Sequence, residues 1–215
     1  MDLSRLFPRS TAKPLLTLFL GLCASGATAA NLTESLTQCQ PAFFKTLYSQ
    51  RGELARVVKV AQDEKRGLAW VPVADRRETQ TALQPFSKPL ADQGLRLSGY
   101  YDRVFDLGKM GTYYFWGFEV DASREAVMAA LPNAGWQEAG EYFISRPQIK
   151  LSADAPWQDN LAAASGIAPA PGSAEKILML SLEEGKTRLL CSLQGSVDAR
   201  LLQQERPDMA QGAGQ

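Results

Sequence analysis

Residues 95–120 limit the fold of this chain more than any other segment, because they contain two runs typical of β-strands. Leu95 to Asp106 and Thr112 to Val120 are dense in aromatic side chains, which favour the pleated surface of a sheet. The four residues that connect them, 108–111, begin and end with glycine and have the length of a hairpin loop. The segment therefore predicts an antiparallel hairpin within an antiparallel sheet.

Strand alternation divides the aromatic residues of this hairpin between the two faces of the sheet. Tyr114 and Trp116 share one face, while Tyr113 and Phe115 share the other. One face must pack into a core, so aromatic residues on the second face predict a further layer, a loop or a partner over it. The functional hypothesis is a platform for a sugar ring, a peptide or a protein, and the alternative is that the aromatic residues fill the core. The candidate binding residues are Tyr100, Tyr101, Tyr113, Tyr114 and Trp116.

The first 30 residues have the three parts of a Sec-type signal peptide. A basic start is followed by an apolar run over residues 15–22 and by small residues over 24–30. We expect cleavage after Ala29 or Ala30 and a periplasmic location. A retained anchor is the first alternative, although the apolar run is shorter than the ~20 residues of a spanning helix. Lipidation of Cys23 is the second. No transmembrane segment is expected in the mature chain.

Cys39 and Cys191 are the two cysteines of the mature chain, and in an exported protein they predict one disulfide. Residues 32–50 carry an apolar stripe at helical spacing that includes Cys39. Pro41 either begins this helix or kinks it, and Gly52 is its expected stop. The disulfide should therefore join the first helix to a late strand.

Two weaker patterns lie between the first helix and the aromatic hairpin. Residues 55–73 predict a second hairpin, and a polar helix over 53–65 is the alternative. Residues 75–93 predict a charged helix that is broken by Pro85 and Pro89.

The segments after residue 120 continue the mixture of helices and strands. They predict a helix over 121–131, a strand over 136–144 that folds back at 139–140, a hairpin over 177–182 and 187–193, and a final helix after Ser196. The expected fold class is α+β: an antiparallel sheet built from hairpins, with helices packed on one face and one disulfide. We expect a single domain over 31–206, a long loop over 146–174 with a short helix near 159–164, and a disordered tail over 207–215.

The absence of histidine excludes several kinds of chemistry. Without histidine the chain has no Ser-His-Asp or Cys-His catalysis and no histidine metal ligands, and we expect no cofactor and no bound metal. The 23 basic and 23 acidic residues balance, so the chain lacks the basic surface of a nucleic-acid-binding protein.

Four carboxylates near the aromatic hairpin provide the one enzymatic hypothesis that the sequence offers. A pair of them could hydrolyse a glycosidic bond, although acidic residues in strands are more often solvated or ion-paired. They are Asp102, Asp106, Glu119 and Asp121.

With these kinds of chemistry excluded, the sequence favours a non-enzymatic binding or accessory protein of the cell envelope, which would bind another envelope or periplasmic protein. An inhibitor or immunity protein is one form of this. The alternatives are a carboxylate-based hydrolase that acts on envelope glycans and a carrier for a small apolar ligand, which would need a cavity behind the hairpin.

Overall fold

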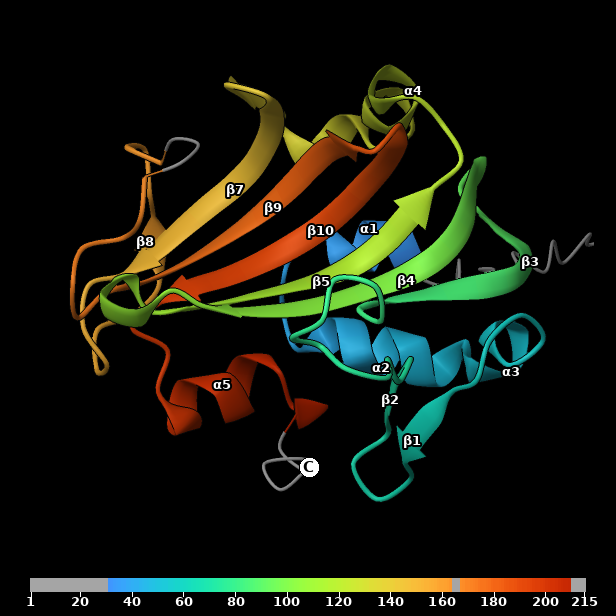
Figure 1. Ribbon diagram of the computed structural model, residues 1–215, viewed down its shortest axis with the longest axis horizontal. Helices are drawn as coiled ribbons and strands as arrows, with labels where there is room; N and C mark the ends of the chain where they lie inside the picture. Colours follow the sequence, from blue (N-terminus) through green and yellow to red (C-terminus); the bar gives the residue numbers. More distant parts are fainter. Residues whose placement is uncertain (1–30, 164–166, 210–215) are drawn as a thin grey trace, which may run out of the picture.

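An eight-stranded antiparallel sheet forms the centre of the structure, a computed structural model that describes residues 31–163 and 167–209 (Figure 1). The strand order is β3-β4-β5-β10-β9-β7-β6, and the short β8 pairs with β7. A separate two-stranded ribbon is formed by β1 and β2. The strands are β1 (Ala61–Asp63), β2 (Leu68–Trp70), β3 (Leu83–Asp92), β4 (Leu95–Asp106), β5 (Thr112–Val120), β6 (Gln137–Ala139), β7 (Tyr142–Lys150), β8 (Gln158–Asp159), β9 (Ala174–Glu183) and β10 (Lys186–Gly195).

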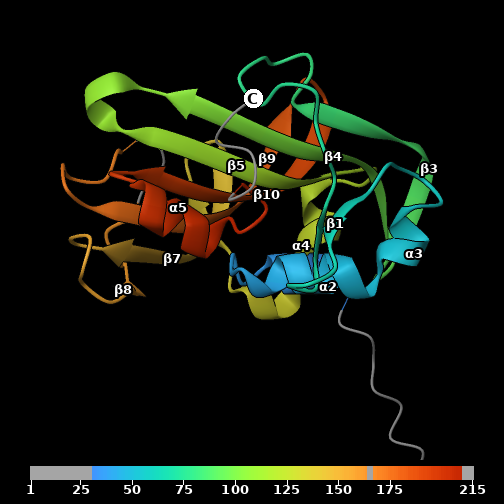
Figure 2. The same ribbon diagram turned by 90° about the horizontal axis from the view of Figure 1, so that it is seen from below.

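Short helices stand before, between and after the strands. They are α1 (Leu32–Leu36), α2 (Ala42–Ser49), α3 (Arg51–Leu54), α4 (Arg124–Ala130) and α5 (Ala199–Glu205), with 3₁₀ turns η1 (Gly108–Met110) and η2 (Pro132–Ala134). Figures 1 and 2 place α2 and α5 on the same side of the sheet. The structure confirms the predicted antiparallel sheet with several helices. The packing of all helices on one face of the sheet stays a prediction.

The main core lies between α1 and α2 and the sheet face that carries Trp116 and Phe118. The ring of Phe43 on α2 meets the ring of Phe118 on β5 at a centroid distance of 5.9 Å. Val127 and Leu131, from α4 and the residue after it, also enter this core. Alternation in β5 therefore buries the even-numbered side chains, as expected for a strand with one face on a core. We call this side of the sheet the core face and the other side the open face.

The predicted disulfide is present. Cys39 lies in the turn between α1 and α2, Cys191 lies on β10, and the two are bonded with their Cα atoms 5.4 Å apart. Cys39 has a φ of +46°, so the chain reverses sharply at the residue that carries the bond. The bond fixes the α1–α2 turn to the central strand of the sheet.

The predicted helix over 75–93 is wrong, because Leu83 to Asp92 form the edge strand β3. Proline disfavours helical geometry at the residue before it, and it is tolerated at the edge of a sheet, where an absent N–H breaks no ladder. The register between β3 and β4 shifts between Pro85 and Leu90, and Pro89 lies within this irregular stretch. Lys88 is exposed on this edge, whereas Asp92 is buried and accepts from the backbone N–H groups of Leu32 and Thr33 at the start of α1.

Pro41 stands at the N-terminus of α2, in agreement with the alternative that a helix begins there. Other details differ from the prediction. Gly52 lies inside α3 instead of ending a helix. The β7 strand extends to Lys150, so the long loop begins later than expected, and no helix forms over 159–163. The hairpins over 95–120 and 177–193 and the fold-back near 139–140 are confirmed.

The chain continues in the folded structure beyond Pro207, where a disordered tail was predicted. Arg206 is fully buried, and its guanidinium donates to Asp102 on β4 at 2.9 Å and to both carboxylate oxygens of Asp208 at 2.9 and 2.8 Å. The Nε of Arg76 donates to Asp102 at 2.7 Å. We call these four residues the ion cluster. It holds the end of the described chain against the core face, whereas residues 1–30 and 210–215, with the predicted signal peptide and the rest of the tail, lie outside the described residues.

Candidate functional site

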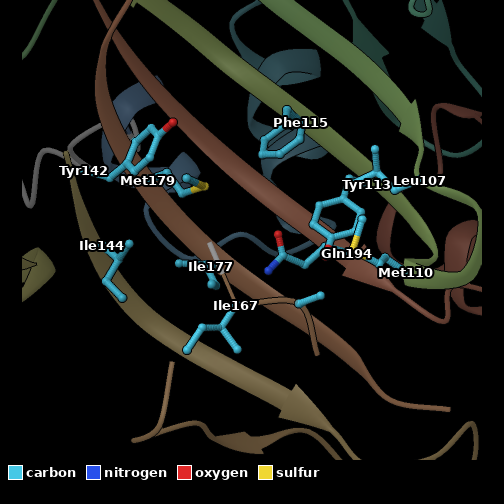
Figure 3. Close-up of a pocket in the computed structure, with 11 residues that line it drawn as sticks. Leu107, Met110, Tyr113, Phe115, Tyr142, Ile144, Ile167, Ile177, Met179 and Gln194 are labelled. Atoms are coloured by element: carbon cyan, nitrogen blue, oxygen red, sulfur yellow. The ribbon is translucent and has the colours of Figure 1, made fainter. Parts of the chain in front are cut away.

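A groove runs along the open face of the sheet (Figure 3). Its volume is about 310 Å³, which is near the lower end of the range for ligand pockets. The side chains come from β5, β7, β9 and β10, from the β4–β5 connection and from the segment after residue 166. The lining residues are Leu107, Met110, Tyr113, Phe115, Tyr142, Ile144, Ile167, Ala168, Ile177, Met179 and Gln194.

Strand alternation explains why the groove is apolar and why it is hollow. The odd-numbered residues of β5 and β9 point to the open face, which places Phe115 and Ile177 on either side of β10. Ser192 of β10 is paired with both of them. Its short side chain leaves the space between the two larger ones unfilled.

A smaller hollow of about 200 Å³ adjoins the groove. The two share Phe115, Tyr142 and Met179 in their walls. The smaller hollow is more polar, because Ser181 and Glu183 contribute to its lining together with Tyr101, Phe105 and Leu190. We call it the adjoining hollow.

Large apolar side chains stand exposed at the rim of these two spaces. Leu107 is 40 % exposed, Met110 54 % and Ile167 64 %, and all three line the groove. Single exposed apolar residues are ordinary on protein surfaces, but a cluster around an apolar hollow is typical of a binding site.

A buried carboxylate is hydrogen-bonded to Gln194, one of the residues that line the groove. Glu175 on β9 is 3 % exposed and accepts from the Nε2 of Gln194 at 2.6 Å and from the Nδ2 of Asn160 at 2.5 Å. Its strand partner Gln194 pairs in turn with Tyr113. Burial raises the pKa of the Glu175 carboxyl above its ordinary value, although the two amide donors act in the opposite direction. The proton therefore binds Glu175 more tightly in the folded chain than in the unfolded chain.

This raised pKa predicts a pH dependence of stability. Between the ordinary and the raised pKa the folded state holds a proton that the unfolded state has lost, so the free energy of unfolding should fall as the pH rises through this window. Glu175→Gln should remove this component of the slope, and any penalty from the changed hydrogen bonds should not vary with pH. Urea unfolding from pH 4 upward would measure both curves. Parallel curves for the two proteins would contradict the assignment.

Two arginines lie on the open face beside the adjoining hollow. The Cζ of Arg103 is 4.5 Å from the ring centroid of Phe105, and the Cζ of Arg188 is 4.5 Å from that of Tyr101. Both residues are buried. The Nη1 of Arg188 donates to Glu183. The Nε and Nη1 of Arg103 and the Nε of Arg188 are buried without an acceptor among the described residues.

The five predicted binding residues divide between the two faces. Tyr113 lines the groove and Tyr101 lines the adjoining hollow. Tyr100 and Trp116 are fully buried in the core, and Tyr114 is 9 % exposed on the same face. Burial raises the pKa of Tyr100 well above its ordinary value, and the charge of Asp102 raises it further. The structure therefore brings two of the five residues to the open face.

The groove residues on β7 and β9 were not among the predicted site residues. Ile177 and Met179 point to the open face, while Leu178 and Leu180 point to the core. A strand that is apolar at both alternating sets of positions is covered on both faces. This signal over 177–182 could have indicated a second apolar surface.

The four carboxylates of the hydrolase hypothesis are not brought together. Asp102 belongs to the ion cluster on the core face, and Glu119 lies on the open face, where Ser98 donates to it at 3.2 Å. Asp106 accepts from the backbone of Gly108 at the end of the hairpin, and Asp121 lies 3.7 Å from Lys186. No two of them face each other across a cleft, as a glycosidase requires.

Comparisons with known proteins give no relative. No family model matches the chain, no curated protein matches its sequence, and no solved structure matches its fold. Over 31–163 and 167–209, no three His, Cys, Asp or Glu side chains are grouped so as to hold a metal ion. In the same ranges no helix has the length and apolar character to cross a bilayer. The functional argument therefore rests on the geometry of the open face.

Proposed function

We propose that this chain is a non-enzymatic binding protein of the bacterial cell envelope, exported to the periplasm, that holds a small apolar or amphiphilic molecule on the open face of its sheet. The observation that carries the proposal is the groove, an apolar hollow of about 310 Å³ with an apolar rim. Apolar side chains form most of its wall, and a few polar groups stand at its ends, as in small-molecule sites generally.

Binding is favoured over catalysis by the side chains that surround the groove. The chain has no histidine, and Glu175, which contacts the groove residue Gln194, is held by two amides. No nucleophile is paired with a base in the wall, which is the arrangement that covalent catalysis needs. In place of catalytic groups, the groove offers a ligand a matching shape and an apolar contact surface.

A charge placed in the wall of the groove should abolish binding. Met179 lines both the groove and the adjoining hollow, so Met179→Lys introduces an ammonium where an apolar group would lie. We expect affinity for the fluorescent apolar probe N-phenyl-1-naphthylamine to fall about tenfold or more. Fluorescence titration of the purified mature chain would measure this.

The matched control is Leu182→Lys. Leu182 lies on the same strand, points to the opposite face and is 55 % exposed, so its replacement should leave probe affinity unchanged. If Met179→Lys and Leu182→Lys bind the probe with equal affinity, the probe does not bind in the groove. If the unmodified chain does not bind the probe, the proposed function is contradicted.

A second candidate is binding to a protein, including an inhibitor or immunity role. The exposed rim formed by Leu107, Met110 and Ile167 favours it, because such side chains are suited to burial against a partner. Crosslinking in intact cells distinguishes the candidates: one dominant crosslinked protein favours the second, and recovery of the chain alone favours a small ligand.

A further inference from the structure

A separate cleft lies at the β7 edge of the sheet (Figure 1). Its volume is about 620 Å³, which is within the usual range for ligand pockets. Its walls come from the turn between α1 and α2, from η2 and the residue after it, and from β6, β7 and β8 with the residues that follow. It shares no lining residue with the groove or the adjoining hollow. We call it the edge cleft.

A gap in strand pairing opens the sheet at this cleft. On its outer side β7 pairs with β6 over residues 142–144 and with β8 over residues 148–149. Between these two pairings, residues 145–147 have no strand beside them on that side among the described residues. The register between β7 and β9 also shifts here, and Arg146 has a φ of +48°. Non-glycine residues in this left-handed region are strained, and they are concentrated at binding and catalytic sites.

Uncharged carboxamide side chains dominate the polar part of the wall, and each of them can both donate and accept hydrogen bonds. The fold uses two of them, because one accepts from Arg146 and another donates to Glu175. The other three make no side-chain hydrogen bond to another described residue, so a ligand can use their donors and acceptors. The two that the fold uses are Gln38 and Asn160, and the three that are free are Gln40, Gln137 and Gln148.

The disulfide holds part of this wall in place. Gln38 and Gln40 flank Cys39, which is bonded to Cys191 on β10. The Oε1 of Gln38 accepts from the Nη1 of Arg146 at 2.8 Å, and the Nη2 of the same arginine donates to a backbone carbonyl of η2 at 2.9 Å. The backbone that carries the two glutamines is therefore fixed before a ligand arrives, which lowers the entropic cost of binding.

The chemistry of the wall matches a neutral sugar. Carboxamides and sugar hydroxyl groups both donate and accept hydrogen bonds, so they can pair in either sense. The two charged residues of the wall, Arg146 and Asp159, have opposite signs, so no net charge selects an ion. Pro147 and Leu161, which is 96 % exposed, offer apolar contact to the C–H face of a sugar ring.

An added peptide strand fits the gap less well than a sugar. Strand addition needs a row of free backbone groups along an exposed edge. Here β6 and β8 occupy both flanks of a gap of three residues, and the carbonyl of Pro147 already accepts from the N–H of Asn160 at 2.8 Å. A sugar would use the side-chain groups instead of the backbone.

We propose that the edge cleft binds a neutral oligosaccharide, with the carboxamides of Gln40, Gln137 and Gln148 hydrogen-bonded to its hydroxyl groups. The disulfide is then a positioning element for this site as well as a crosslink of the fold. The cleft is separate from the groove, so this inference goes beyond the proposed function and does not depend on it.

Isothermal titration calorimetry of the purified mature chain would test the site, with maltotriose, cellotriose and tri-N-acetylchitotriose as probes. We expect at least one of the three to bind. The double variant Gln40→Met with Gln148→Met keeps the side-chain lengths and removes two amides, so affinity for that sugar should fall about tenfold, the expected effect of two lost hydrogen bonds. The matched control is Gln203→Met, because Gln203 is an exposed glutamine of α5 outside the cleft, and its replacement should leave affinity unchanged.

Removal of the disulfide tests its positioning role. The double variant Cys39→Ala with Cys191→Ala should bind the same sugar severalfold more weakly, because the turn that carries Gln38 and Gln40 is no longer fixed to β10. The comparison is made in conditions where near-ultraviolet circular dichroism shows that the variant is folded. Equal affinity of the variant and the unmodified chain would overturn the positioning role.

The remaining outcomes decide the inference separately from the proposed function. If none of the three neutral trisaccharides binds, the inference is overturned, while the proposed function is unaffected because the groove is tested with its own probe. If the double glutamine variant binds the sugar as tightly as the unmodified chain, the sugar does not bind in the edge cleft. If trigalacturonate binds more tightly than all three neutral sugars, the ligand is not a neutral oligosaccharide.

Discussion

Replacing Arg206 with methionine should lower the free energy of unfolding by about 3–5 kcal/mol, the range for a buried ion pair that loses one partner. In the ion cluster two arginines face two carboxylates. Without Arg206, Asp102 and Asp208 would share Arg76, which is the more exposed of the two arginines. One buried negative charge would then remain without compensation.

Arg206 is charged in the folded chain despite its complete burial. Burial by itself lowers the pKa of a guanidinium, but the carboxylates of Asp102 and Asp208 outweigh it and raise the pKa above its ordinary value. Its Cζ also lies 4.7 Å from the ring centroid of Trp116. A methionine at position 206 can fill part of the apolar space. The expected loss of stability therefore comes from the carboxylates of Asp102 and Asp208, which lose an ion-pair partner.

Urea unfolding monitored by tryptophan fluorescence would measure the Arg206 effect. The control is Arg200→Met, which removes an arginine of α5 whose ion pair with Asp154 is exposed and screened by solvent, and it should leave stability nearly unchanged. Adding Asp208→Asn to Arg206→Met should recover part of the loss, because it removes the uncompensated charge. A single variant no less stable than the Arg200 control would refute the role assigned to the cluster.

Removal of the disulfide should be the other large effect. Replacement of Cys39 and Cys191 by alanine opens a loop with a sequence separation of 152. The unfolded chain would gain the freedom that the bond denies it, and removal of a native disulfide typically lowers stability by about 2–5 kcal/mol. Both cysteines are buried, so alanine avoids an unsatisfied hydroxyl at either position.

Chemical reduction of the disulfide in the unmodified chain provides the control for the double-alanine variant. Dithiothreitol should lower the urea midpoint of the unmodified chain toward that of the double-alanine variant, and it should leave the variant itself unchanged. A variant that unfolds at the same urea concentration as the oxidised chain would show that the bond contributes nothing to stability.

The sequence predicts the hairpins of this fold better than it predicts the edge strand of the sheet. Aromatic and β-branched residues between glycine turns identify β4 with β5 and β9 with β10, because both the strand pattern and the turn chemistry are local. The same reasoning does not identify the β3 strand. Its two prolines and the exposed Lys88 suit the edge of a sheet, but without knowledge of the sheet the same residues resemble an interrupted helix.

The site was predictable only in part, because a groove depends on strand order. Alternation separates Tyr113 from Tyr114 correctly, yet it cannot tell which face is covered by helices. Ile177 and Met179 adjoin Phe115 only because β10 stands between β5 and β9. The unpaired condition of Arg103 is equally invisible in the sequence, since it depends on the absence of an acceptor in three dimensions.

The position of β10 has a consequence for the order in which the protein can assemble. The strands β3, β4 and β5 form one half of the sheet, β9, β7 and β6 form the other, and β10 hydrogen-bonds to both. The strand that joins the halves is therefore the last strand along the described residues, and it carries Cys191. A chain that lacks residues 186–195 has neither a continuous sheet nor the Cys39–Cys191 disulfide, so the two halves can be joined only after β10 has been synthesised.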